Sequence, residues 1–156
     1  MQEDIKVTNE ACDRLEIADA LYRFAAGIDF NDADLLASTF AENAVADFTP
    51  SAAKLGIEFP ILEGRKSIVR GITNSVAQLD TTHVVTNPRI KISGDTAKLY
   101  AIVEAQHLPP NDHSRHCLMK NQYDVNLVRS GDRWVIENML IDNVWFTGDP
   151  AVVQGQ

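Results

Sequence analysis

The stretch HVVTNPRIKISGDTAKLYAIVEAQHL, residues 83–108, decides the fold class. Both halves are rich in β-branched residues, and the Gly94-Asp95 dipeptide between them is typical of a tight hairpin turn. We therefore predict two antiparallel strands, over residues 83–93 and 97–108.

Two further long strands follow this hairpin. The turn Ser130-Gly131-Asp132 joins a strand predicted over residues 117–129 to another over residues 133–146. A loop with the sequence Pro109-Pro110-Asn111-Asp112 connects them to the first pair. The second half of the chain is thus a run of antiparallel strands.

Helical periodicity dominates the part of the chain before residue 83. Apolar residues recur at helical spacing over about residues 9–28, with Leu15 and Tyr22 in the stripe, and Thr8 or Asn9 can cap the start. Two more helices are predicted over residues 32–40 and 65–79, and a short strand over 44–48. This order predicts an α+β fold, with three N-terminal helices packed on a strongly curved mixed or antiparallel sheet, a cone that encloses a pocket.

Two segments carry no periodic pattern. Residues 51–60 are predicted to be irregular and are a candidate lid over the pocket, and the tail after Gly148 is predicted to be frayed. No linker or repeat divides the chain, so we predict one domain over residues 1–156.

Charge excludes several classes of partner. The 156 residues include 14 Lys and Arg against 22 Asp and Glu, which gives a net charge of 14 − 22 = −8. This acidity argues against nucleic acid and against an anionic membrane surface. No apolar stretch is long enough for a membrane span, and the first residues are polar, so a cytoplasmic location is predicted. Cys12 and Cys117 are predicted to be free thiols.

Asp29 is the first candidate for chemistry. It follows Ala25 by four residues and Leu21 by eight, so it continues the apolar stripe of the first helix and points toward the core. A carboxylate at a helix C-terminus is unfavourable without a partner. The alternative is an exposed loop residue that caps the next helix.

His83 is the second candidate because it opens the first long strand. Val85 and Asn87 share its side if the alternation is regular. A histidine beside a buried carboxylate can serve as a general base or acid near neutral pH. The alternative is a core histidine whose hydrogen bonds are purely structural.

His107 ends the strand face that also carries Leu99, Ala101, Val103 and Ala105. These side chains are mostly small, which leaves room for a cavity with His107 at its end. The alternative is a rim residue in the following loop.

Asn121 and Tyr123 lie on the inward face of the next strand, with Met119, Val125 and Leu127. Buried polar groups need partners, and either a ligand or structural hydrogen bonds could supply them.

Metal and cofactor sites have little support. His107, His113, His116 and Asp112 lie near one loop but lack the spacing of a helical zinc site. The chain contains no GxGxxG, P-loop or GxSxG motif. We therefore expect neither a metal nor a cofactor.

The last strand is apolar on both predicted faces. Strict alternation puts Trp134, Ile136, Leu140 and Val144 on one face, and Met139, Ile141 and Trp145 on the other. One face would then pack inside and the other against another subunit, which predicts a homo-oligomer.

The arrangement resembles the SnoaL-like branch of the nuclear-transport-factor-2-like (cystatin-like) superfamily, over about residues 13–146. Within it, the chain is similar to scytalone dehydratase and hexachlorocyclohexane dehydrochlorinase. The segments that carry the resemblance are Gly27-Ile28-Asp29, Phe40-Ala41-Glu42-Asn43-Ala44, Gly64-Arg65, Thr82-His83-Val84-Val85-Thr86-Asn87, Gly94-Asp95-Thr96-Ala97 and Gly131-Asp132-Arg133-Trp134.

The resemblance implies site roles. Asp29 would orient His83 as the base, and His107 would hold or protonate the leaving oxygen. Ile28 and Phe48 stand where scytalone dehydratase has tyrosines, so they are expected to contact the ligand. Asn121 and Tyr123 would take over part of the polar role, and Arg129 is a candidate to receive a leaving anion.

The sequence therefore predicts a cofactor-independent, dehydratase-like (lyase) enzyme. It would act on a small hydrophobic cyclic or aromatic molecule through an Asp-His dyad. Alternatives are an enzyme like ketosteroid isomerase or a polyketide cyclase, and a non-catalytic ligand-binding or partner-subunit module of the same fold. The resemblance implies a homodimer or homotrimer.

Overall fold

The computed structural model describes the backbone of residues 1–156 and the side chains of all residues except 3–8. The first helix, α1, spans Gln2–Asp29 and is capped by Met1, so it begins seven residues earlier than predicted. The predicted cap at Thr8 lies outside the described side chains.

The chain continues through four helical segments and six strands. Their bounds are α2 Ala33–Ala37, β1 Phe40–Asp47, α3 Thr49–Lys54, β2 Leu62–Glu63, α4 Arg65–Val76, β3 Asp80–Ser93, β4 Thr96–Leu108, β5 Cys117–Ser130, β6 Arg133–Gly148 and the 3-10 helix η1 Pro150–Gln154.

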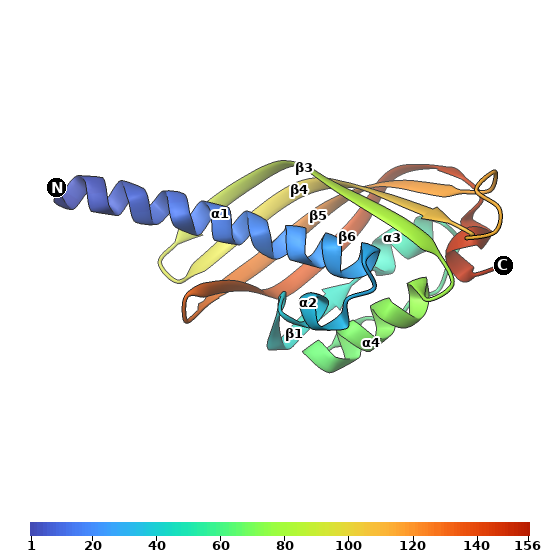
Figure 1. Ribbon diagram of the computed structural model, residues 1–156, viewed down its shortest axis with the longest axis horizontal. Coiled ribbons are helices and arrows are strands. Elements are labelled where there is room, and N and C mark those ends of the chain that lie inside the picture. Colours follow the sequence, from blue (N-terminus) through green and yellow to red (C-terminus); the bar gives the residue numbers. More distant parts are fainter.

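The six strands form one mixed sheet in the order β2-β1-β6-β5-β4-β3. Strand β1 runs parallel to β6, and the other neighbours are antiparallel. The fold is α+β: α1 lies along the long strands, and α2 and α4 lie beside β1 (Figure 1). The prediction of a strongly curved cone is wrong, because β2 and β3 remain separate edges and the sheet is not strongly curled. Helices, rather than the sheet itself, complete the enclosure.

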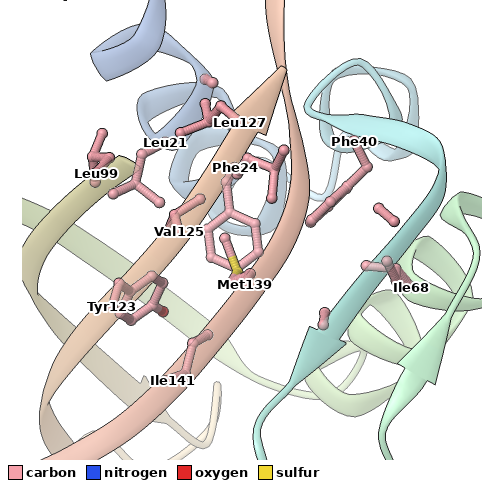
Figure 2. Close-up of a cluster of buried hydrophobic side chains, with 14 of the residues drawn as sticks. Leu21, Phe24, Phe40, Ile68, Leu99, Tyr123, Val125, Leu127, Met139 and Ile141 are labelled. Carbon is pink, nitrogen blue, oxygen red and sulfur yellow. The ribbon is translucent and has the colours of Figure 1, made fainter. Parts of the chain in front are cut away.

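The predicted alternation of β4 and β5 is confirmed. The inward residues of both strands are buried, while most outward residues are partly or fully exposed. In the core, the ring of Phe24 packs edge-on against Phe40 and Tyr123, with centroids 6.0 and 5.9 Å apart (Figure 2). Helix α1, strand β1 and strand β5 therefore meet in one core.

The predicted faces of β6 are wrong because two bulges shift the alternation. The pairing with β5 skips Glu137 and later Val144, so each bulge moves the following side chains to the opposite face. Trp134, Ile136, Met139 and Ile141 all become buried on the inner face, while Leu140, Val144 and Trp145 are exposed.

A similar shift occurs in β3. Asn87 adopts a φ of 54° at an irregularity between Thr86 and Arg89, and its side chain is exposed instead of sharing the side of His83. In α1, Leu15 and Tyr22 are exposed, and the buried stripe passes through Ile17, Ala20, Leu21, Phe24 and Ile28.

The segment predicted to be irregular begins as helix α3. Pro50 occupies its first turn, and Ser51 is buried. Lys54 fixes its end to β6, with Nζ 2.7 Å from the Asn143 carbonyl and 2.8 Å from the Asp142 carboxylate. A helix of six residues is too short to be recognised from periodicity.

The tail is ordered rather than frayed. Asp149 caps η1 by accepting a hydrogen bond from the Ala151 amide, and Val152 is completely buried. Arg115 donates to both Asp149 and the Gln156 carbonyl, which fixes the last residues. Within the described part of the chain, none of the helices combines the length and the apolar character that a bilayer crossing requires.

Candidate active site

A cavity of about 500 Å³ lies between the inner face of the sheet and the surrounding helices. Its walls come from α1, α3, α4, the inner faces of β3 to β6 and the residues around η1. Most of the lining is apolar. The polar side chains that the sequence singled out on its walls are His83, His107, Asn121 and Tyr123.

Asp29 and His83 form a hydrogen-bonded pair. The Asp29 Oδ1 atom lies 2.6 Å from His83 Nδ1, and Oδ2 accepts the His83 backbone N–H at 2.7 Å. The Thr81 hydroxyl donates to Oδ1 at 2.9 Å. The alternative role of Asp29 as a helix cap does not hold, because Asp32 caps α2 by accepting the Leu35 amide.

These donors hold Asp29 in its ionised form. Burial by itself would raise the pKa of Asp29, but the hydrogen bonds and charge of His83, with the Thr81 hydroxyl, lower it below its ordinary value of 3.8. A carboxylate can only accept, so Nδ1 of His83 carries the proton. In a neutral imidazole, Nε2 then holds the lone pair, and no described residue bonds to it.

His107 is a buried neutral imidazole, not a rim residue. Its Nδ1 lies 3.3 Å from the Cys117 carbonyl oxygen, and because a carbonyl only accepts, Nδ1 carries the proton. Burial lowers the pKa of His107 from 6.5 to about 4, and repulsion from His83 adds to the effect. The two rings are 6.0 Å apart between centroids. At neutral pH, Nε2 of His107 therefore accepts hydrogen bonds and cannot donate a proton.

Asn121 is fixed by two polar neighbours, Asn143 on β6 and Ser51 on α3. Its Oδ1 accepts a hydrogen bond from Asn143 Nδ2 at 2.9 Å and a longer one from the Ser51 hydroxyl at 3.4 Å. Structural hydrogen bonds therefore satisfy the side-chain oxygen of Asn121. Its side-chain nitrogen has no acceptor among the described residues.

Tyr123 is 2% exposed, and its ring packs on Phe24 (Figure 2). Burial and the nearby Asp29 charge raise the pKa of Tyr123, so its hydroxyl stays protonated. No described residue accepts a hydrogen bond from this hydroxyl.

The remaining predicted ligand contacts separate into two groups. Ile28 and Phe48 line the cavity, and their contact with a ligand stays a prediction. Arg129 is not part of the lining: its guanidinium binds the carboxylates of Asp13 and Asp95 and stacks on Trp134. The ligand-binding prediction for Arg129 does not fit this placement, because its N–H groups bind two carboxylates and its guanidinium stacks on Trp134, near the end of β5 away from the cavity.

The loop histidines do not converge on a common point. His113 Nε2 pairs with Asp80 at 2.8 Å on the surface, whereas His107 is buried in the cavity wall. Among the described side chains, no group of three His, Cys, Asp or Glu residues is arranged to hold a metal ion. Both described cysteines are free thiols.

Three residues that support the site were not identified from the sequence. Thr81 could have been found, since it lies two residues before His83 on the same side of the strand. Asn143 was hidden by the bulge at Glu137, which reverses the expected face of the later β6 residues. Ser51 was hidden because α3 is too short to show a period.

Comparison with known proteins identifies the family. A profile of the SnoaL-like domain matches residues 9–139. The chain is 31% identical over 155 residues to terrestric acid biosynthesis cluster protein E of Penicillium crustosum, covering 95% of this chain and 94% of that protein.

Solved structures share the fold. The Kfla4162 protein of Kribbella flavida superimposes with a TM-score of 0.80 at 21% identity, covering 91% of this chain and 97% of that one. A type 2 hexachlorocyclohexane dehydrochlorinase gives 0.76 at 17% identity, with 90% and 91% covered. A candidate scytalone dehydratase from Novosphingobium aromaticivorans gives 0.74 at 18% identity, with 95% and 91% covered. With the profile match over most of its length, the chain belongs to the SnoaL-like domain family, which has the cystatin-like fold.

Proposed function

We propose that this protein is a cofactor-independent acid–base enzyme that removes a proton from a small hydrophobic cyclic or aromatic molecule. The observation that carries the proposal is the 2.6 Å contact between Asp29 and His83 in the wall of a largely apolar cavity. An oriented imidazole with a free Nε2 in a largely apolar cavity is suited to general base catalysis.

The proton transfer follows from the hydrogen-bond directions. His83 Nε2 takes a proton from substrate carbon, and the resulting imidazolium is stabilised by the ionised Asp29 through Nδ1. The electron pair left on carbon forms a double bond while a leaving group departs. His83 then returns its proton to the departing group, so the enzyme ends in its starting state.

His107 has a different role from the one that the resemblance implied. Its Nδ1–H is bonded to the Cys117 carbonyl, so its Nε2 accepts a hydrogen bond from a substrate hydroxyl. This contact would hold a leaving oxygen in place. Protonation of that oxygen would come from His83.

The relatives favour elimination on a small molecule. The Penicillium relative is named for a biosynthesis cluster, which supports a small organic substrate. Structures with the same fold carry the names of a dehydratase and a dehydrochlorinase, both eliminating enzymes. These likenesses are the reason why elimination is proposed ahead of isomerisation or cyclisation.

We also propose a homo-oligomer, a dimer or trimer. The motivating observation is the set of apolar side chains exposed on the outer face of the sheet and its rim: Tyr100, Leu140, Val144 and Trp145. Sedimentation at micromolar concentration tests this, and a strictly monomeric mass would remove it.

The functional test combines binding with isotope exchange. A panel of small phenols, cyclic ketones and terpenoids is screened for thermal stabilisation, and the compounds that bind are incubated with the protein in D2O. We expect deuterium incorporation or elimination by the wild type and its loss in His83→Ala and Asp29→Asn. The matched control is His113→Ala, which removes an exposed histidine outside the cavity. Ligands that bind without any exchange or elimination would identify a binding module instead.

A further inference from the structure

Asn143 lies behind the cavity wall, on β6, and is 2% exposed. Its Nδ2 donates to the Trp145 carbonyl at 3.0 Å, to Asn121 Oδ1 at 2.9 Å and, at 3.4 Å, to the Lys120 carbonyl. Two of these three acceptors are backbone carbonyls, which can only accept. The backbone therefore determines that the nitrogen of Asn143, and not its oxygen, faces Asn121.

The orientation of the Asn143 amide determines the orientation of the Asn121 amide. Because Asn143 offers N–H groups, the atom of Asn121 that meets them must be its oxygen, and the Ser51 hydroxyl approaches the same atom. The Asn121 NH2 group is then left without a protein acceptor among the described residues. Since Asn121 lines the cavity, this donor is directed to whatever occupies it.

Tyr123 lies two residues further along the same inward face of β5. The residue is 2% exposed, and its protonated hydroxyl has no described hydrogen-bond partner in the protein; Tyr123 also lines the cavity. A donor that lines a cavity and has no protein partner can bind an acceptor atom of a ligand that enters the cavity. Asn121 and Tyr123 thus place two adjacent donors on the β5 wall of the cavity, whereas Nε2 of His83 and Nε2 of His107 are acceptors on the neighbouring strands β3 and β4. Further polar side chains line the cavity away from this sheet wall, including Glu58, Asn74, Gln78 and Gln154.

We propose that Asn143 is a specificity-determining positioning residue: it holds Asn121 as a donor, so that Asn121 and Tyr123 together select ligands carrying a carbonyl oxygen. This inference deepens the proposed function, on which it rests for the existence of a small-molecule substrate. It assigns the substrate class as a cyclic or aromatic ketone, lactone or similar carbonyl compound.

The test compares two probes of nearly equal shape. 1-Tetralone carries a carbonyl oxygen and tetralin does not, so the ratio of their Kd values isolates the oxygen. We expect Tyr123→Phe and Asn121→Asp each to reduce the wild-type preference for the ketone by about threefold to tenfold, the range of one net hydrogen bond. The infrared C=O stretch of bound 1-tetralone should also rise in both variants, because each removes a donor.

Tyr100→Phe is the matched control. The Tyr100 hydroxyl is bonded to Gln122 on the opposite face of the sheet, so its loss should leave the ratio and the C=O stretch unchanged. Tyr123→Phe removes a hydroxyl that no described residue uses, so this variant is expected to fold.

Asn143→Asp tests the positioning role itself. A carboxylate cannot donate to Asn121, so the Asn121 amide should turn and present its oxygen to the cavity. The preference should then shift toward 1-tetralol, which offers a hydroxyl donor, and away from 1-tetralone. A purely structural role would weaken all probes alike. Asn121→Asp changes the polarity of the wall without altering Asn143, so the proposal stays testable if Asn143→Asp does not fold.

A ketone that does not bind, or a Kd ratio that is unchanged in both Tyr123→Phe and Asn121→Asp, overturns the proposal. Exchange of the α-protons of 1-tetralone in D2O separates it from the proposed function. If the wild type exchanges these protons but the Kd ratios are unchanged in the variants, only the role of Asn121 and Tyr123 as carbonyl-selecting donors is refuted. If the Kd ratios change in the variants but the wild type exchanges no protons, the donor role of Asn121 and Tyr123 is supported and the proposed proton transfer is refuted.

Discussion

Acidification should destabilise this protein through His107. Burial lowers the pKa of His107 from 6.5 to about 4 in the folded state. Between these two pH values the imidazole is protonated in the unfolded chain but stays neutral in the native state. Stability therefore decreases as the pH falls through this window and is fully present above it. Each tenfold change in proton affinity corresponds to about 1.4 kcal/mol, so the loss should total about 3 kcal/mol.

The assay is urea unfolding followed by the fluorescence of Trp134 and Trp145, repeated between about pH 7.5 and pH 4. The free energy of unfolding is compared for the wild type and His107→Gln. Groups such as Asp29 titrate in both proteins, so their contributions largely cancel in the difference. The advantage of the wild type should decrease by about 3 kcal/mol over this range, because the variant has no imidazole to protonate.

His113→Gln serves as the control, since His113 is exposed and pairs with Asp80 on the surface. Its difference from the wild type should vary by less than about 1 kcal/mol over the same range. If the wild type and His107→Gln lose stability in parallel as the pH falls, His107 is not a buried neutral histidine, and its assignment as an acceptor is wrong.

Three further predictions concern other parts of the structure. Gly27→Ala should lower the free energy of unfolding by about 1–3 kcal/mol, because its Cβ would lie 2.8 Å from the Leu36 backbone; Gly71→Ala, which meets only a movable side chain, should cost less in the same urea titration. Arg129→Met should leave the Kd for 1-tetralone unchanged and lower the free energy of unfolding by no more than about 1 kcal/mol. Weaker binding of 1-tetralone would show that Arg129 contributes to the binding site. Val144→Glu should shift the sedimentation coefficient toward the monomer if the outer sheet face is the interface, and an oligomer of unchanged size would exclude this residue from it.

The sequence was informative where the local pattern is regular. The inward faces of β4 and β5 follow strict alternation over their whole length, which is why His107, Asn121 and Tyr123 could be placed on the cavity wall. Asp29 could be placed because it continues a helical stripe, and His83 because it lies near the start of a strand.

Prediction failed where a single residue interrupts the period. The bulges at Glu137 and Val144 each reverse the faces of β6, and nothing in the local composition marks them, so Asn143 was missed. The α3 helix and η1 are stabilised by tertiary contacts such as those of Lys54 and Arg115, which join residues far apart in the chain. The tautomer of His107 depends on the Cys117 carbonyl of the neighbouring strand and is equally invisible to periodicity.

The central claim, that His83 oriented by Asp29 is a base directed into the cavity, is tested most directly by proton exchange with a bound carbon acid. The measurement is the rate at which protein saturated with 1-tetralone exchanges the α-protons of the ketone in D2O. General base catalysis predicts that His83→Ala lowers this rate by at least about 100-fold while the Kd for the ketone stays within about threefold. Equal rates in the wild type and His83→Ala at saturation would contradict the account.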